Sequence, residues 1–152
     1  YIYLLYSLAL ATNAQLIYEI GVNGARSTHA FLCAMQITGG QLWSCDVVDY
    51  DHRVTDEKLR KHWGFFHTPA AEWRKSLSSQ CDIVFIDGHH NYEFVSEDVE
   101  NFWPFVKKGG LMVLHDTKYM ERGPGEVFRE LKEQGVGIID LPTQHGIAVA
   151  RK

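Results

Sequence analysis

The sequence predicts one α/β domain in which helices cover both faces of a doubly wound, mostly parallel β-sheet. Short stretches rich in β-branched and aromatic residues recur along the chain, and stretches with a helical spacing of apolar residues separate them. Strands that alternate with helices imply right-handed βαβ crossovers. Such crossovers build a parallel sheet with a helix layer on each side.

Four stretches have the length and composition of buried parallel strands, and each ends at a turn signal. They are residues 16–22, 41–48, 81–87 and 111–115. A shorter strand is expected at 63–66. At the C-terminal end, 137–141 and 147–150 are expected to form an antiparallel hairpin across the turn at 142–146.

The clearest helix is predicted at 92–106, where apolar residues recur at three and four positions and acids occupy the other face. Pro104 and the pair Gly109 and Gly110 mark its end. A short helix through Trp73 is expected to begin with Thr68 as N-cap. The remaining helices are predicted at 27–35, at 55–62, between residues 124 and 135, and in the apolar segment 1–14, which packs on the domain.

The length and charge of the chain restrict its function. Its 152 residues match one domain, 1–152, and because the first residue is not Met we expect an upstream segment to be missing. A net charge of -4 without a Lys/Arg cluster argues against nucleic-acid binding and favours a small-molecule partner. The opening apolar run is too short to span a membrane. The sequence leaves open whether the chain forms a homo-oligomer.

Three cysteines at wide spacing lie among apolar residues: Cys33, Cys45 and Cys81. Their odd number and spacing are typical of reduced core thiols and not of a disulfide framework. The sequence therefore predicts a cytoplasmic protein.

A glycine-containing turn follows the first predicted strand, from Glu19 through Gly21 and Gly24 to Ser27. Glycines let the backbone approach a ligand closely. The turn lacks the third glycine of the dinucleotide fingerprint, and Glu19 would repel a pyrophosphate, so a ligand with an ammonium group fits better. A tight turn without a ligand is the alternative.

Acids also end the next strands. Asp46 follows the glycine turn by about twenty residues, the spacing at which a carboxylate holds the ribose hydroxyls of a nucleoside. Asp87 and Asp116 end two further strands, and His89, His90 and His115 lie beside them. Carboxylates at neighbouring strand ends can hold a divalent cation or share a proton, or they can simply cap helices.

These residues resemble the class I S-adenosylmethionine-dependent methyltransferases, and within them the small-molecule O-methyltransferase-like group. The resemblance rests on the stretch 86–92, then Asp98, Trp103 with Pro104, the stretch 108–110, and 115–117. The turn from Glu19 to Thr28 is similar to the cofactor loop of the group. The resemblance implies a Rossmann-like fold and methyl transfer from S-adenosylmethionine (SAM) to a small hydroxyl-bearing acceptor.

The resemblance also implies roles for single residues. It assigns the cofactor to Glu19, Gly21, Val22, Gly24, Ser27, Thr28, Asp46, Thr68, Ala70 and Asp87. Relatives often carry Gly-Asp-Ser where this chain has Thr68, Pro69 and Ala70, so an acidic contact to adenine is missing there and a backbone contact is expected instead. Asp87 and Asp116 resemble the ligands of magnesium-dependent members, but His115 stands where several of those carry an acid.

For catalysis the sequence favours His89 as general base, because imidazole titrates near neutrality. Asp87 and Asp116 are expected to position the acceptor, directly or through a cation, and His115 is expected to join the catalytic residues. The loops 49–54 and 117–125 are expected to shape the acceptor pocket. His145, in the hairpin turn, should reach the same edge of the sheet. Two alternatives stay open: a nicotinamide-dependent oxidoreductase with the same glycine turn, and a non-catalytic methyltransferase-like binding module.

Overall fold

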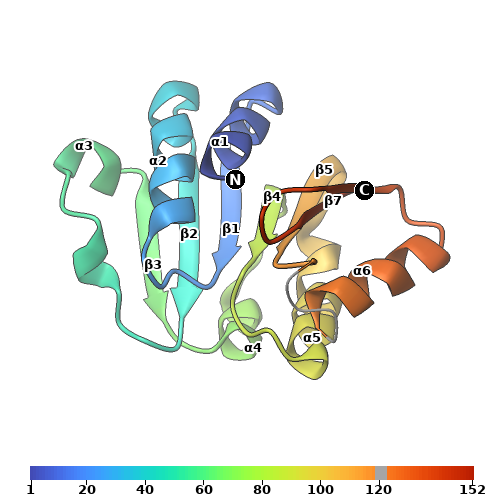
Figure 1. The fold of residues 1–152 in the computed structure, drawn as a ribbon. Helices are drawn as coiled ribbons and strands as arrows, with labels where there is room; N and C mark the ends of the chain where they lie inside the picture. Colours follow the sequence, from blue (N-terminus) through green and yellow to red (C-terminus); the bar gives the residue numbers. More distant parts are fainter. Residues whose placement is uncertain (119–122) are drawn as a thin grey trace.

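A seven-stranded sheet in the order β3-β2-β1-β4-β5-β7-β6 forms the centre of the fold (Figure 1). The computed structural model describes residues 1–118 and 123–152, so part of the predicted acceptor loop, 119–122, lies outside the described residues. Strands β1 to β5 are parallel, and β7 runs antiparallel to β5 and β6. The strands are β1 (Leu16–Ile20), β2 (Gln41–Asp46), β3 (Trp63–His67), β4 (Cys81–Ile86), β5 (Val106–His115), β6 (Ile138–Leu141) and β7 (Ile147–Arg151). The predicted mostly parallel sheet with a C-terminal hairpin is confirmed.

Helices cover both faces of the sheet, as predicted. One layer contains α1 (Ile2–Ala11), α2 (Arg26–Thr38) and α3 (Glu57–Arg60). The other layer contains α4 (Ala70–Trp73), α5 (Tyr92–Phe102) and α6 (Pro124–Glu133). Short 3-10 helices lie at η1 (Asp51–Arg53), η2 (Arg74–Ser76) and η3 (Trp103–Phe105). The α1 helix packs on α2, with Leu5 and Ala9 fully buried.

Successive residues of the central strands enter opposite hydrophobic cores. In β4, Ile83 and Phe85 pack in the core under α1 and α2, while Val84 and Ile86 pack in the core under α5. Side chains of a strand alternate between its two faces, so a strand covered on both sides is mostly apolar, and any polar residue in it needs a buried partner. This explains why the central strands read as continuous apolar stretches.

Strand β5 starts at Val106, well before the predicted start at 111. The pair Gly109 and Gly110 was interpreted as a turn, but it lies inside the strand, where Gly109 has a φ of +82°. The register between β4 and β5 shifts between Cys81 and Ile83, opposite these glycines. Glycines at such a place mark a β-bulge, and a bulge has the same sequence signal as a turn.

Two smaller differences concern helix starts and the cysteines. Pro69, and not Thr68, is the N-cap of α4. All three cysteines are free, but Cys33 is exposed and so is not a core thiol. It lies on α2, which buries its other face against the sheet.

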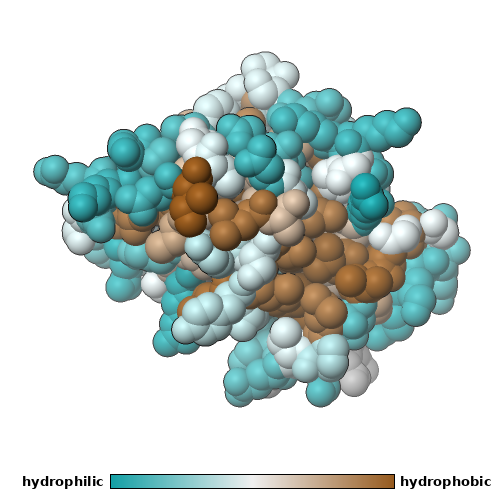
Figure 2. Space-filling model, turned by 90° about the horizontal axis from the view of Figure 1, so that it is seen from above, coloured by the Kyte–Doolittle hydropathy of each residue, from teal (hydrophilic) through white to brown (hydrophobic). Residues whose placement is uncertain are grey.

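Apolar side chains also reach the surface. Figure 2 shows hydrophobic residues gathered in the middle of the face seen from above, with hydrophilic residues around them. Large exposed hydrophobic side chains include Tyr3 on α1, which is 83% exposed, and Ile37 on α2. Within 1–118 and 123–152, no helix combines the length and the apolar composition that crossing a bilayer requires.

Candidate functional site

A cleft of about 990 Å³ lies along the edge of the sheet where the parallel strands end. Its walls come from the segments that directly follow β1, β2, β3, β4 and β5. The strand order reverses between β1 and β4, and a crevice at such a reversal is where doubly wound sheets bind ligands. The topology therefore brings the predicted site residues to one place.

The glycine turn after β1 depends on Gly21. Its φ is +92°, and a Cβ there would lie only 2.8 Å from Gly88 Cα in the turn after β4. The backbone of Asp87 donates a hydrogen bond to Ile20 O at 2.9 Å, which holds the two turns together. A Cβ on Gly24 would meet no atom within 4 Å, because this residue borders the open cleft.

The carboxylate of Asp46 joins the ends of β1 and β2. Its Oδ2 accepts hydrogen bonds from the backbone of Val22 at 2.8 Å and of Asn23 at 3.3 Å, and its Oδ1 accepts one from Val48 N at 3.0 Å. Each carboxylate oxygen has more than one acceptor site. Asp46 also lines the cleft, so its predicted contact with a ribose stays a prediction.

Glu19 lies beneath the cleft and does not line it, contrary to the expectation. Its side chain is fully buried and accepts hydrogen bonds from the hydroxyls of Ser27 at 2.7 Å, Thr28 at 2.8 Å and Ser44 at 2.7 Å. Burial raises its pKa to about 7, and the three hydroxyls act against this rise. Thr28 is fully buried too, and both residues therefore support the turn from below.

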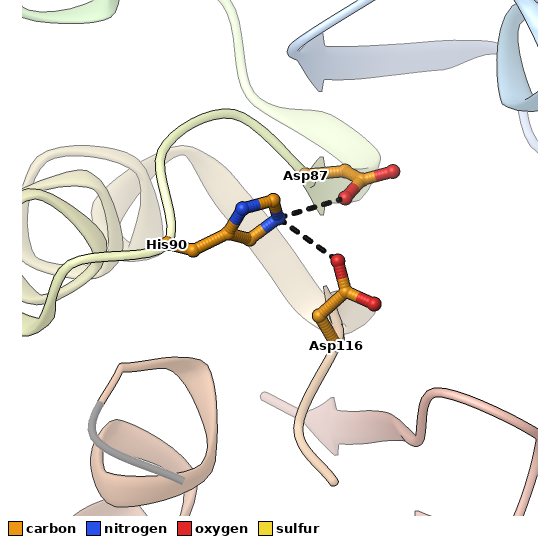
Figure 3. A group of neighbouring side chains, drawn as sticks. All are labelled: Asp87, His90 and Asp116. Atoms are coloured by element: carbon orange, nitrogen blue, oxygen red, sulfur yellow. Dashed lines mark ion pairs between the residues drawn. The ribbon is translucent and has the colours of Figure 1, made fainter. Parts of the chain in front are cut away.

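Asp87, His90 and Asp116 meet at the other end of the cleft (Figure 3). His90 Nε2 lies 2.9 Å from Asp116 Oδ2 and 3.8 Å from Asp87 Oδ1. It is not aligned for a hydrogen bond with any described residue, so these are charge contacts. Asp116 has a φ of +60°, a conformation that non-glycine residues adopt rarely and that clusters at functional sites.

Two further histidines complete this cluster. His115 Nδ1 lies 3.1 Å from Asp87 Oδ1 and 3.3 Å from Asp116 Oδ1, and its side chain is only 8% exposed. His145, in the turn between β6 and β7, lies 3.8 Å from Asp116 Oδ1, which agrees with its predicted position. The aromatic ring of Tyr1 covers His115 at a centroid distance of 4.5 Å.

The charges of the cluster stabilise one another. Burial acts to raise the pKa of Asp87, but the contacts with His115 and His90 outweigh it and hold this pKa below its usual range. The contact with Asp87 raises the pKa of His90. Burial lowers the pKa of His115, yet Asp87 and Asp116 outweigh burial, so the net shift is upward. Both carboxyl groups therefore sit beside imidazoles that readily hold a proton.

His89, the base preferred from the sequence, lines the cleft but does not contact Asp87 or Asp116 in any contact the structure gives. Its side chain is exposed, its ring contacts Phe94 at a centroid distance of 4.4 Å, and its Nδ1 accepts a hydrogen bond from Asn91 N at 3.1 Å. The structure instead places His90 between the two carboxylates. Sequence reasoning could not separate the two neighbours, because both follow the strand end directly.

The structure adds residues that the sequence analysis did not name. Tyr1, Tyr50 and Phe94 line the cleft, as do the expected Thr68 and Ala70. One ligand atom from each of Asp87, His90 and Asp116 lies within 4.8 Å of the others, so these residues can hold a cation. Two carboxylate oxygens and a histidine nitrogen suit a divalent metal.

A family described as Methyltransferase domain matches residues 18–117. The chain belongs to this family. The matched region contains the glycine turn, Asp46 and the cluster of Asp87, His90 and Asp116. The recognition of a methyltransferase is thereby confirmed, and the oxidoreductase alternative has no support.

Solved structures share the fold. The O-methyltransferase TomG from Streptomyces achromogenes, in complex with SAM, has a TM-score of 0.79 and 18% identity, over 99% of this chain and 78% of TomG. The methyltransferase MycE of the mycinamycin biosynthetic pathway, in complex with Mg and S-adenosylhomocysteine (SAH), has a TM-score of 0.74 and 20% identity, over 96% of this chain and 47% of MycE. The Rossmann-like methyltransferase fold is thereby confirmed.

One curated relative is known only as the uncharacterized protein y4gI of Sinorhizobium fredii. It is 32% identical over 73 residues, which are 47% of this chain. This chain spans only 8% of the length of that relative.

Proposed function

We propose that this chain transfers the methyl group of SAM to a hydroxyl group of a small molecule. One observation carries the proposal: two groups of residues line the same cleft. The glycine turn and Asp46 form the part suited to a nucleoside. Asp87, His90 and Asp116 form the part suited to proton transfer. Methyl transfer needs both parts side by side. TomG, which shares the fold, is an O-methyltransferase in complex with SAM.

The residues of the glycine turn fit the cofactor. Gly21 allows the close approach of two strand ends, and Gly24 leaves space open toward the cleft. Asp46 and Asp87 both line the cleft, where Asp46 would accept hydrogen bonds from ribose hydroxyls and Asp87 would face the positive sulfonium. Val22, Ser27, Thr68 and Ala70 complete this part of the wall. SAM supplies an electrophilic methyl group, and the chain supplies its placement.

His90 is the general base of the proposed reaction. The acceptor oxygen attacks the methyl carbon in line with the departing sulfur, so a new C–O bond forms as the C–S bond breaks. The hydroxyl proton passes to His90 Nε2. Asp116 and Asp87, at 2.9 Å and 3.8 Å, stabilise the imidazolium that results. His115 holds Asp87 in place.

Asp87 and Asp116 can also hold a divalent cation; His90 belongs to the same group, so it accepts the proton only if its nitrogen does not ligate the cation. A cation at this place would supply positive charge that lowers the pKa of the acceptor hydroxyl. MycE is in complex with Mg. We therefore expect methyl transfer to stop on exhaustive chelation and to return when magnesium is added back. Full activity after chelation would remove the cation from the proposal.

The cofactor is tested by calorimetric titration with SAH and with NAD. We expect SAH to bind with one site per chain and NAD not to bind. Asp46→Ala should weaken SAH binding by about 1–3 kcal/mol, because hydroxyls lose their acceptor. Asp49→Ala, on the same loop but outside the cleft wall, is the control and should bind like the wild type. NAD binding without SAH binding would refute the proposal.

The reaction is tested with SAM carrying a labelled methyl group and a panel of phenols, sugars and natural-product hydroxyls. We expect the labelled methyl group to appear as a methyl ether on at least one of the acceptors. SAH binding without turnover on any acceptor would favour the non-catalytic binding module. A cytoplasmic location belongs to the same proposal and is supported by the three unpaired thiols.

A further inference from the structure

A largely buried acid lies in the cleft wall, outside the cluster of residues that would handle the methyl group. Asp98 is on α5 and lines the cleft, yet its residue surface is only 8% exposed. Within 1–118 and 123–152, its carboxyl group has no hydrogen-bond or ion-pair partner, whereas the other buried acid, Glu19, has three. The carboxyl oxygens are not fully enclosed and so open to the cleft, and an acid without a partner in such a largely buried place calls for a functional explanation.

The position of Asp98 follows from the order of the strands. The cluster of Asp87 and Asp116 follows β4 and β5, while Asp46 follows β2. The α5 helix packs against α6 and also against α4, which follows β3, the neighbour of β2 at the edge of the sheet. Asp98 is also close enough to Cys45, at the end of β2, to raise the pKa of that thiol. It therefore lies at the nucleoside end of the cleft.

We infer that Asp98 recognises the adenine ring of the cofactor by accepting a hydrogen bond from its 6-amino group. The inference rests on the proposed function, since it assumes that SAM occupies the cleft. Adenine presents an amino donor next to the N1 acceptor. A carboxyl oxygen can accept from the amino group, and a carboxyl group that holds its proton can also donate to N1.

The neighbouring turn after β3 carries no acidic side chain that could take this role. Thr68, Pro69 and Ala70 carry no carboxylate, and the backbone of Thr68 already donates to Asp46 O at 2.9 Å. Pro69 has no N–H to donate. The acid that this turn lacks is thus supplied from α5.

The protonation of Asp98 supports this pairing. Burial, and to a lesser extent the neighbouring carboxylate of Glu97, raises the pKa of Asp98 to about 7. Around neutral pH a substantial fraction of the carboxyl group therefore keeps its proton, and this form matches both polar atoms of the adenine edge. Asparagine has the same shape, with an oxygen that accepts and an amino group that donates, so it should replace Asp98 in this role.

The test compares SAH with its analogue that carries hydrogen in place of the 6-amino group. Calorimetry on the whole chain measures both ligands with the wild type, Asp98→Ala, Asp98→Asn and Glu97→Gln. Glu97 is the control, because it lines the same wall but is exposed. We expect the wild type to prefer SAH by about 10- to 100-fold, the range for a hydrogen bond to an ionisable group.

Asp98→Ala should bind both ligands equally, while Asp98→Asn and Glu97→Gln keep the preference. An Asp98→Ala variant that retains the full preference for SAH would overturn the inference, as would equal weakening of both ligands, because a purely structural role would affect them alike. If Asp98→Ala does not fold, loss of the preference in Asp98→Asn overturns the inference instead. Failure of the wild type to bind either ligand would refute the proposed function itself.

Discussion

Replacing Glu19 with glutamine should change how the stability of the protein depends on pH. Glu19 is fully buried under the glycine turn, and its carboxylate accepts three hydroxyl hydrogen bonds. Burial nevertheless raises its pKa from an ordinary 4.5 to about 7. The folded protein therefore keeps a proton on Glu19 at pH values where the unfolded chain has already released it.

The sign and size of the effect follow from this difference. Between pH 4.5 and about 7 the folded state binds more protons than the unfolded state, so the free energy of unfolding falls as the pH rises. The contribution is present in full below pH 4.5 and is lost above about pH 7. At about 1.4 kcal/mol for each tenfold change in proton affinity, the loss amounts to about 3 kcal/mol.

Urea denaturation of the wild type and of Glu19→Gln at pH 4.5, 6 and 8 measures this loss. Other titrating groups are the same in both proteins, so the difference between the two free energies of unfolding isolates Glu19. We expect the free energy of unfolding of Glu19→Gln to rise relative to that of the wild type by about 3 kcal/mol from pH 4.5 to pH 8. Glu133→Gln, an exposed acid at the end of α6, should show no such movement. A Glu19→Gln difference that stays constant with pH would show that Glu19 titrates like an exposed acid.

Two further predictions concern the cleft. Gly21→Ala should lower the free energy of unfolding by roughly 1–3 kcal/mol, because it adds a Cβ to a residue with a φ of +92° and places it against Gly88; Gly24→Ala, with open space around it, should be nearly neutral in the same urea titrations. His90→Ala should lower the rate of methyl transfer by about 10²- to 10⁴-fold, while His89→Ala keeps a rate near that of the wild type. A larger loss in His89→Ala than in His90→Ala would return the base role to His89.

The order of the elements could be predicted from the sequence because it depends on local signals. Each apolar strand segment and each amphipathic helix can be recognised from its own residues. The right-handed crossover rule then predicts the topology from the order of these elements. The start of β5 could not be predicted in this way. Gly109 and Gly110 signal a sharp bend of the backbone, and only the pairing of β5 with β4 decides whether the bend ends a strand or bulges it.

The location of the site was predictable for the same reason. In a parallel sheet every strand that points the same way ends at the same edge, so Asp46, Asp87 and Asp116 had to come near one another. The choice between His89 and His90 was not predictable, since it depends on side-chain direction in a loop. There, the ring of Phe94 packs on one imidazole, while the other turns to Asp116.

Glu19 shows what separates a supporting acid from one that contacts a ligand. It stands inside β1, in register with Ser44 on β2, whereas Asp46 is the last residue of its strand. A side chain one position before the end of a buried strand points into the protein and must find its partners there. Hydroxyls at Ser27, Thr28 and Ser44 supply them. Hydroxyl residues on the neighbouring strand and on the first turn of the following helix are therefore a sequence signal that such an acid is buried.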